Sequence, residues 1–190
     1  MNLSDASITQ ALVNVEAAEA RLKRSVAASA REKSEQLKGA AYDEILTACQ
    51  DAVDTVRQGI DGLERDGTDE GDKRMQELRI CHLALSYNLI TWRVGRNRTL
   101  IGELDGADFE PRFIKPQRNR RPKDGEGSTP RRPPIPERRG KKLARLRERV
   151  ALYDAIMQSI ESVKELKGAA RDATFLNELD AKRSYFRALK

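Results

Sequence analysis

Proline placement is the strongest constraint on the fold of this chain of 190 residues. All seven prolines lie between Pro111 and Pro136. Proline removes a helical hydrogen bond and clashes with the preceding turn, so a regular helix is excluded across residues 107–137. Glycine and serine lie among these prolines, which predicts a disordered or polyproline-like loop. Such a loop is too long for an ordinary helix connection, so it is either functional or a tolerated insertion.

Helical periodicity dominates the rest of the sequence. Apolar residues recur at spacings of three and four, which places them on one face of an α-helix. No strand signal competes with this pattern. The sequence therefore predicts an all-α fold of four or five long helices, arranged as a bundle or a TPR-like helical array. The positions that mark the successive helices run over residues 8–22, 37–63, 78–96, 143–166 and 175–189, with Arg96 as the last position of the third.

Basic charge is concentrated in residues 112–149, which we call the basic segment. It contains fifteen Lys or Arg and four Asp or Glu, a net charge of +11, whereas the whole chain carries +6. The remaining residues therefore sum to −5. A mildly acidic body with one strongly cationic segment suggests a polyanionic partner, and RNA is the first candidate.

Eleven cations of the basic segment are the candidate RNA-binding residues. Guanidinium groups bind phosphate through a bidentate fork, and flexible Arg-rich segments can fold on RNA. Arg93, Arg96 and Arg98 add three cations at the end of the third predicted helix. The alternative interpretation is a solvated loop kept soluble by charge, or a localisation signal. The candidates are Arg118, Arg120, Arg121, Arg131, Arg132, Arg138, Arg139, Lys141, Lys142, Arg145 and Arg149.

Catalytic and metal-binding patterns find little support. The single histidine, His82, is preceded by Cys81, and adjacent helical residues do not face each other, so they cannot form a catalytic dyad. Cys49 and Cys81 are far apart in sequence and are expected to be buried free thiols in a reducing compartment. We therefore expect no enzyme activity, no metal site and no cofactor. No apolar run approaches the roughly 18 residues that span a bilayer, so membrane insertion is not expected.

Several helical stretches resemble a known family. The sequence ALYDAIMQSIESVKELKGAARDATFLNELDAKRSYFRA, residues 151–188, is similar to part of the 68-kDa subunit of the eukaryotic signal recognition particle. The LYD start, the spacing to Leu166 and Gly168, and the closing aromatic helix all agree with that family. The run from Glu44 to Arg57 is similar too, as is the helix end at Arg96-Asn97.

The resemblance covers most of residues 8–104 and 143–190, whereas the basic segment is longer and richer in proline than the family pattern. It implies a non-catalytic scaffold in a ribonucleoprotein that targets ribosomes making secretory proteins to the endoplasmic reticulum. It implies 7S RNA and the 72-kDa subunit as partners, with a ribosome contact as a further option. It also implies a cytoplasmic protein with a nuclear or nucleolar assembly phase and endoplasmic reticulum association.

In that family, the main RNA-binding module lies N-terminal to the part that this chain resembles, and the contact with the 72-kDa subunit lies toward the C-terminal end. No family RNA-contact residue can therefore be matched to a position here. The last helix ends on an aromatic, apolar face without a cap, so we expect the chain to be the middle of a longer protein. Composition alone leaves an alternative: a free-standing helical RNA-binding protein that uses the basic segment.

We expect three parts within one domain. Residues 1–106 form three helices, residues 107–137 form a basic, Pro-rich flexible loop, and residues 138–190 form two helices packed on the first part. Six residues on apolar helix faces are expected to be buried together in the core: Ile45, Leu85, Leu89, Trp92, Ile156 and Ile160.

Overall fold

The computed structural model describes residues 3–29, 35–106, 113–114, 135–136, 139–166 and 173–190. The predicted all-α fold is confirmed, and the long helices carry nearly all of the described structure. A 3-10 turn, η1 (Glu103–Gly106), follows the fourth helix. The helices are α1 (Leu3–Ser29), α2 (Glu35–Ala40), α3 (Asp43–Arg65), α4 (Lys73–Ile101), α5 (Arg139–Lys164) and α6 (Ala173–Leu189).

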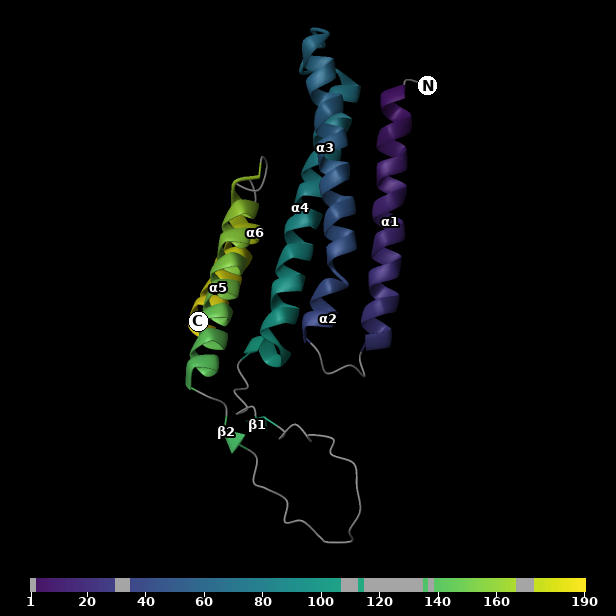
Figure 1. The fold of residues 1–190 in the computed structure, drawn as a ribbon. Coiled ribbons are helices and arrows are strands. Elements are labelled where there is room, and N and C mark those ends of the chain that lie inside the picture. Colours follow the sequence, from purple (N-terminus) through teal and green to yellow (C-terminus); the bar gives the residue numbers. More distant parts are fainter. Residues whose placement is uncertain (1–2, 30–34, 107–112, 115–134, 137–138, 167–172) are drawn as a thin grey trace, which may run out of the picture.

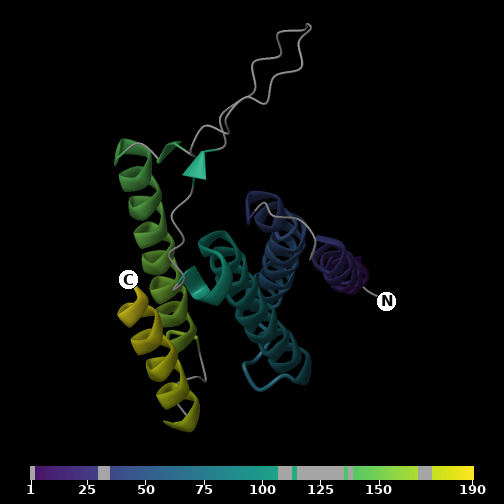
Figure 2. The same cartoon turned by 90° about the horizontal axis from the view of Figure 1, so that it is seen from below.

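The helices form an up-and-down array in which packing runs from each long helix to the next. The main contacts join α1 to α3, α3 to α4, α4 to α5 and α5 to α6, while α2 rests on α4. Figures 1 and 2 show α4 in the middle, with α1 and α3 on one side and α5 and α6 on the other. Helix α4 therefore takes part in the packing of both groups.

Two hydrophobic clusters lie on opposite sides of α4, so the expectation of one common core is wrong. The first joins α1, α3 and α4 and contains Ile45, Leu85 and Leu89. The second joins the end of α4 to α5 and α6 and contains Ile156 and Ile160. The separation arises because α4 lies between two groups of helices and presents apolar side chains to a neighbour on each side.

Trp92 is another correction to the expected core. It is only half-buried and packs at the edge of the first cluster, with its ring centroid 6.3 Å from that of Tyr42. It lies on the α2 side of α4, where a six-residue helix covers less surface than a long one.

The second predicted helix is interrupted, which is also a difference from the expectation. It divides into α2 and α3 at a turn where the backbone N–H of Tyr42 donates to the carbonyl of Gly39 at 3.1 Å. A Cβ atom on Gly39 would lie 2.5 Å from Cδ2 of Leu100, so glycine allows α2 to approach the end of α4. Apolar periodicity continues across the turn, and Tyr42 provides no side-chain cap. The described parts of residues 1–106 therefore contain four α-helices, where three were expected.

A short strand pair overturns the expectation of no strands. Strands β1 (Phe113–Ile114) and β2 (Ile135–Pro136) pair antiparallel, with Phe113 opposite Pro136 and Ile114 opposite Ile135. Aromatic and β-branched residues favour extended backbone, and proline is tolerated because both strands are edges. The rest of the loop predicted over residues 107–137 lies outside the described residues.

Candidate nucleic-acid interface

The first half of α5 is the described part of the basic segment. Arg139, Lys141, Lys142 and Arg147 are exposed, and the buried residues of α5 begin only at Tyr153. Leu, Ala, Lys and Arg have high helix propensity, which accounts for a helix here without a buried face. Residues 139–150 make up about 18 Å of helix at 1.5 Å per residue.

This half of α5 extends past the end of α6. An ion pair of 2.6 Å joins Lys190 Nζ to Asp154 Oδ1, so the last residue of the chain lies level with the middle of α5. Figure 2 shows the beginning of α5 continuing beyond that point. At this end of α5, Arg139, Lys141 and Lys142 are exposed in the described structure.

The charges at the beginning of α5 oppose the helix dipole. Cations are unfavourable at a helix N-terminus, where the partial charge is already positive, yet Arg139, Lys141 and Lys142 occupy the first turn and no acidic residue does. An anion bound there would reduce the repulsion between these cations and the helix N-terminus, and also the repulsion among the cations themselves. An unfavourable placement of charge that brings no evident gain in stability is typical of a functional position.

Four of the candidate cations share one face of α5. At 100° per residue, Lys141, Lys142, Arg145 and Arg149 fall within about 100° of one another around the helix axis. Arg145 and Arg149 are half-buried, and Nη1 of Arg149 donates to the backbone carbonyl of Gly106 at 3.2 Å. Arg149 therefore helps to hold the fold, and the side chains of Lys141 and Lys142 are exposed.

The remaining six candidates lie outside the described residues. Strands β1 and β2 nevertheless place the two ends of residues 115–134 side by side, two residues before the start of α5. Their assignment as RNA-binding residues stays a prediction. The six are Arg118, Arg120, Arg121, Arg131, Arg132 and Arg138.

The arginines at the end of α4 are engaged within the fold. Arg93 Nη2 donates to Gln50 Oε1 at 3.1 Å, and Arg96 Nε donates to Asp43 Oδ1 at 2.9 Å. Both bonds join α4 to α3. Arg98 contacts Asp105, as described next. These three cations therefore have structural partners, which sequence spacing did not indicate.

Asp105 is the centre of a polar cluster where α4, η1, α5 and α6 meet. Its side chain accepts two hydrogen bonds from Arg98, at 2.6 Å from Nε and 3.1 Å from Nη2. The hydroxyl of Tyr185 donates at 2.9 Å to Oδ2, the oxygen that also accepts from Nη2 of Arg98. The hydroxyl of Tyr153 donates to the backbone carbonyl of Asp105. Only 8% of Asp105 is exposed. The cluster thus joins η1, which precedes the loop predicted over residues 107–137, to the middle of α5.

Electrostatics keep this carboxylate charged. Burial alone would raise the pKa of Asp105, but the hydrogen bonds from Arg98 and Tyr185 and the charge of Arg98 outweigh it, so the pKa lies below its ordinary value. The same hydrogen bond from Arg98 raises the pKa of that guanidinium. The hydrogen bond to Asp105 also raises the pKa of Tyr185. The cluster therefore remains an ion pair at neutral pH.

The turn at Asp105 and Gly106 has a specific backbone requirement. Asp105 has φ +52° and Gly106 has φ +74°, and Asp and Gly are the residues that tolerate this region. A Cβ on Gly106 would lie 2.4 Å from Cγ2 of Ile101. The Asp-Gly pair was the only sequence signal for this cluster, since neither tyrosine carries a recognisable spacing relative to it.

Nothing in the described part of the chain adds a metal or thiol centre. No group of three or more His, Cys, Asp or Glu side chains gathers there to hold a metal ion. Both described cysteines are free thiols, Cys49 buried and Cys81 half-buried, and burial raises the pKa of each. None of the described helices is long and apolar enough to cross a membrane.

These features define a helical scaffold protein that presents a cationic helix end to solvent. The chain belongs to the signal recognition particle 68 family, because the model of the family described as "RNA-binding signal recognition particle 68" matches residues 1–190. The predicted resemblance is therefore confirmed, and the family match extends over the basic segment as well.

A curated relative from fission yeast agrees with this assignment. The chain is 26% identical over 141 residues to the "Signal recognition particle subunit srp68" of Schizosaccharomyces pombe, strain 972. The match covers 73% of this chain but 17% of the yeast protein, so the chain spans less than a fifth of that relative. No solved structure shows a significant match to the chain.

Proposed function

We propose that this chain is a non-catalytic scaffold segment of the signal recognition particle that holds a cationic helix end against 7S RNA. Within the particle, this segment supports assembly with the 72-kDa subunit during co-translational targeting of secretory proteins to the endoplasmic reticulum. It acts in the cytoplasm, after a nuclear or nucleolar assembly phase. Family membership favours this function over a free-standing RNA-binding protein.

One observation carries the RNA contact: the first half of α5 has no buried residue, and its first turn contains cations but no acidic residue. Lys and Arg on such a helix meet phosphates more than base edges, so the contact is auxiliary and largely independent of base sequence. The same cations can meet ribosomal RNA. Tethering by an RNA-binding module elsewhere in the particle would raise the effective concentration, so a weak contact contributes there.

The experiment replaces Arg139, Lys141, Lys142 and Arg145 by Gln and measures 7S RNA binding as a function of salt. Each phosphate contact contributes about 0.9 to the slope of log K against log salt for duplex RNA or DNA, so the slope should fall by about 3 to 4. Circular dichroism checks that α5 remains helical. An unrelated duplex tests whether the contact prefers 7S RNA.

A matched variant controls for net charge. Exposed cations on other helices, Lys23, Arg24, Arg65 and Lys73, are changed to Gln together, which alters the total charge equally but leaves α5 intact. The control should keep the parent slope. Equal slopes for the parent and the α5 variant would show that the beginning of α5 only increases solubility.

A further inference from the structure

Helix α4 contains a long stretch without formal charge. Residues 80–92 include no Asp, Glu, Lys or Arg, although 35% of the chain is charged. A helix that carries no charge around its circumference is normally covered on all sides. Helix α4 is covered by α3 through Leu85 and Leu89 and by α5 and α6 through Ile90.

One side of this stretch is not covered. Ile80 is 67% exposed and Tyr87 is 38% exposed, and Ala84 and Thr91 between and beyond them are exposed as well. Their spacing of three and four residues places them in one stripe along α4. From Ile80 to Thr91 the stripe is about 16 Å long, or three helical turns.

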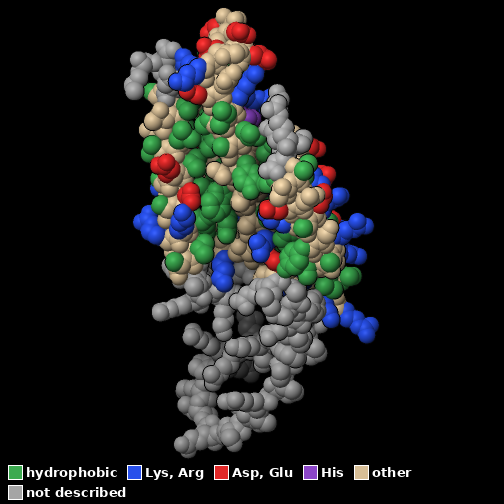
Figure 3. All heavy atoms as spheres, turned by 180° about the vertical axis from the view of Figure 1, so that it is seen from behind, with side chains coloured by type: hydrophobic (Ala, Val, Ile, Leu, Met, Phe, Trp, Pro, Cys, Tyr) green, Lys and Arg blue, Asp and Glu red, His purple; other side chains and the backbone are tan. Residues whose placement is uncertain are grey.

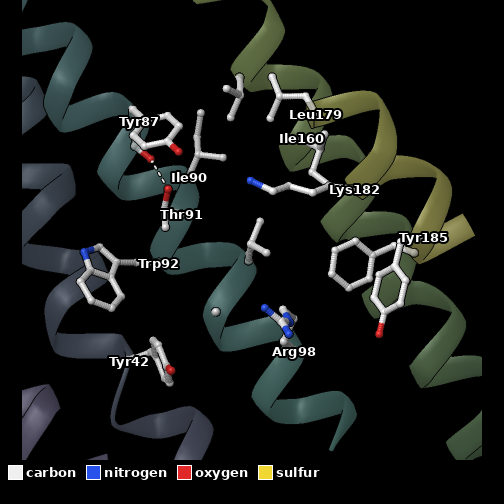
Figure 4. A pocket seen from close by; sticks show the side chains of 14 residues that line it. Tyr42, Tyr87, Ile90, Thr91, Trp92, Arg98, Ile160, Leu179, Lys182 and Tyr185 are labelled. Atoms are coloured by element: carbon white, nitrogen blue, oxygen red, sulfur yellow. Dashed lines mark hydrogen bonds between the residues drawn. The ribbon is translucent and has the colours of Figure 1, made fainter. Parts of the chain in front are cut away.

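The stripe leads into a hollow of about 410 Å³ between α4 and α6. Its apolar lining includes Ile90, Val94 and Trp92 of α4 and Leu179 and Phe186 of α6. Figure 4 shows the open space between the two helices, and Figure 3 shows hydrophobic side chains gathered along the middle of this face of the molecule. We call the stripe and the hollow together the α4–α6 groove.

The charge of the groove is cationic. Its lining includes Arg98 and Lys182 but no Asp or Glu, and Glu178, one turn before Lys182, is exposed outside the lining. Arg98 is neutralised by Asp105. Lys182 extends from α6 into the space toward α4 (Figure 4), and it has no ion-pair partner in the described part of the chain.

Further donors surround the groove. Among the described residues, the indole N–H of Trp92 and the hydroxyl of Tyr42 donate no hydrogen bond. Both side chains line the hollow. With Lys182 and the hydroxyl of Tyr87, which donates to no described residue either, they make four groups that can donate to a bound molecule, whereas no lining carboxylate can accept. The groove is therefore complementary to an apolar surface that carries acceptors.

We propose that the α4–α6 groove binds an amphipathic, acidic helix of a partner protein. The apolar face of that helix lies along the α4 stripe, as in other helix-in-groove interactions, and a carboxylate at its edge pairs with Lys182. RNA is disfavoured because one free cation in an apolar hollow neutralises few phosphates. The groove is separate from the beginning of α5, so this inference does not rest on the proposed RNA contact.

Trp92 gives the experiment a local readout, because it is the only tryptophan in the chain and it lines the groove. The probe is a phage-displayed library of twenty-residue helical peptides that lack Trp, selected on the whole chain. The expected consensus has apolar residues at i, i+3, i+4 and i+7 with Glu or Asp beside them. A selected peptide should shift the Trp92 emission in a saturable titration.

Charge and apolar variants test the contacts. Lys182→Glu should raise the dissociation constant of the peptide about fivefold, as expected for the loss of an exposed charge pair. Ile80→Ser should raise it about tenfold, because less apolar surface is buried. Lys23→Glu and Val13→Ser are matched controls on α1, where both residues are exposed. They should bind as the parent does.

Five outcomes would overturn the proposal. The first is a selection that enriches no peptide family, and the second is an enriched basic consensus. The third is that the selected peptides bind both groove variants as tightly as they bind the parent. The fourth is concentration-dependent self-association that buries Trp92, which would make a second copy of the chain the occupant. Sedimentation of the parent chain alone tests whether the chain self-associates. Competition by 7S RNA at the Trp92 signal would assign the groove to RNA instead and would equally contradict the proposal.

Discussion

Asp105 is the residue on which the position of α5 depends most. It is nearly buried, sits in left-handed backbone conformation and accepts hydrogen bonds from α4 and α6, while its own carbonyl accepts from α5. A buried carboxylate is favourable only when such partners replace its hydration. The cluster therefore fixes the end of α4 relative to the two C-terminal helices.

Replacing Asp105 by Asn tests this at the residue scale. Asn keeps the backbone conformation but removes the charge, so at pH 7 we expect a loss of about 1.5–3 kcal/mol in the free energy of unfolding, as for hydrogen bonds to charged groups. The lowered pKa of Asp105 means that its contribution is full above the unfolded value of about 3.9 and is lost as pH falls through the folded value. Urea titrations at pH 7 and near pH 2.5 measure the difference.

Tyr153→Phe is the matched control for this prediction. It removes a hydrogen bond to the backbone carbonyl of the same residue without touching a group that titrates between these pH values. Its cost should be similar at both pH values. A loss for Asp105→Asn that is equally large near pH 2.5 would contradict the electrostatic explanation.

At the scale of elements, the helix faces followed from apolar spacing, but their partners did not. Leu89 and Ile90 are neighbours in sequence and both are buried, yet they belong to different clusters. Periodicity shows that a face is apolar and not which helix covers it. The division between α2 and α3 could not be predicted from the sequence either. Glycine is required at position 39 because of its contact with Leu100, which lies more than sixty positions away.

Two core truncations test the division of the core. Leu89→Ala and Ile156→Ala should each cost about 2–5 kcal/mol of unfolding free energy. Because the two side chains lie in different clusters, the costs should add to within about 0.5 kcal/mol in the double variant. Leu85 and Leu89 share a cluster, so that pair should show measurable coupling. A coupling above about 1 kcal/mol between Leu89 and Ile156 would instead indicate a shared core.

At the scale of the whole molecule, the array is continuous because α4 contributes to both clusters. The prediction that residues 138–190 pack on the earlier helices as one domain can be tested by cutting the chain. The second cluster takes Ile90 and Ile101 from α4 and Ile156 and Ile160 from α5. Hydrophobic contact alone should therefore hold the two pieces together.

A specific protease site inserted within residues 115–134 provides the cut. After cleavage, the two pieces should co-elute in size-exclusion chromatography under native conditions. Ile101→Asp places a charge in the second cluster, where Ile101 is fully buried, and should separate the cleaved pieces. Separation of the cleaved parent chain would show that the C-terminal helices are an independent unit.

The candidate site was predictable in its charge and only partly in its geometry. Composition located the basic segment, and the C-terminal helical part was expected from residue 138, one position before α5 begins at Arg139. The roles of Arg98 and Arg149 could not be predicted from helical spacing. Asp105 lies beyond the end of α4, where the turn sets its position relative to Arg98, and Gly106 is 43 positions away from Arg149. The groove also depends on tertiary structure, since Trp92 and Lys182 lie ninety residues apart.

The pairing of β1 with β2 bears on how sequences of this kind can diverge. Ile114 and Ile135 are paired across the ladder. The twenty residues between them therefore begin and end at the same place in the fold. Closing a loop of twice the length would cost only about 0.6 kcal/mol more. Insertions or deletions between the strands can thus change the number of arginines while the helices stay where they are. Evolution can adjust the strength of a polyanion contact here independently of the fold.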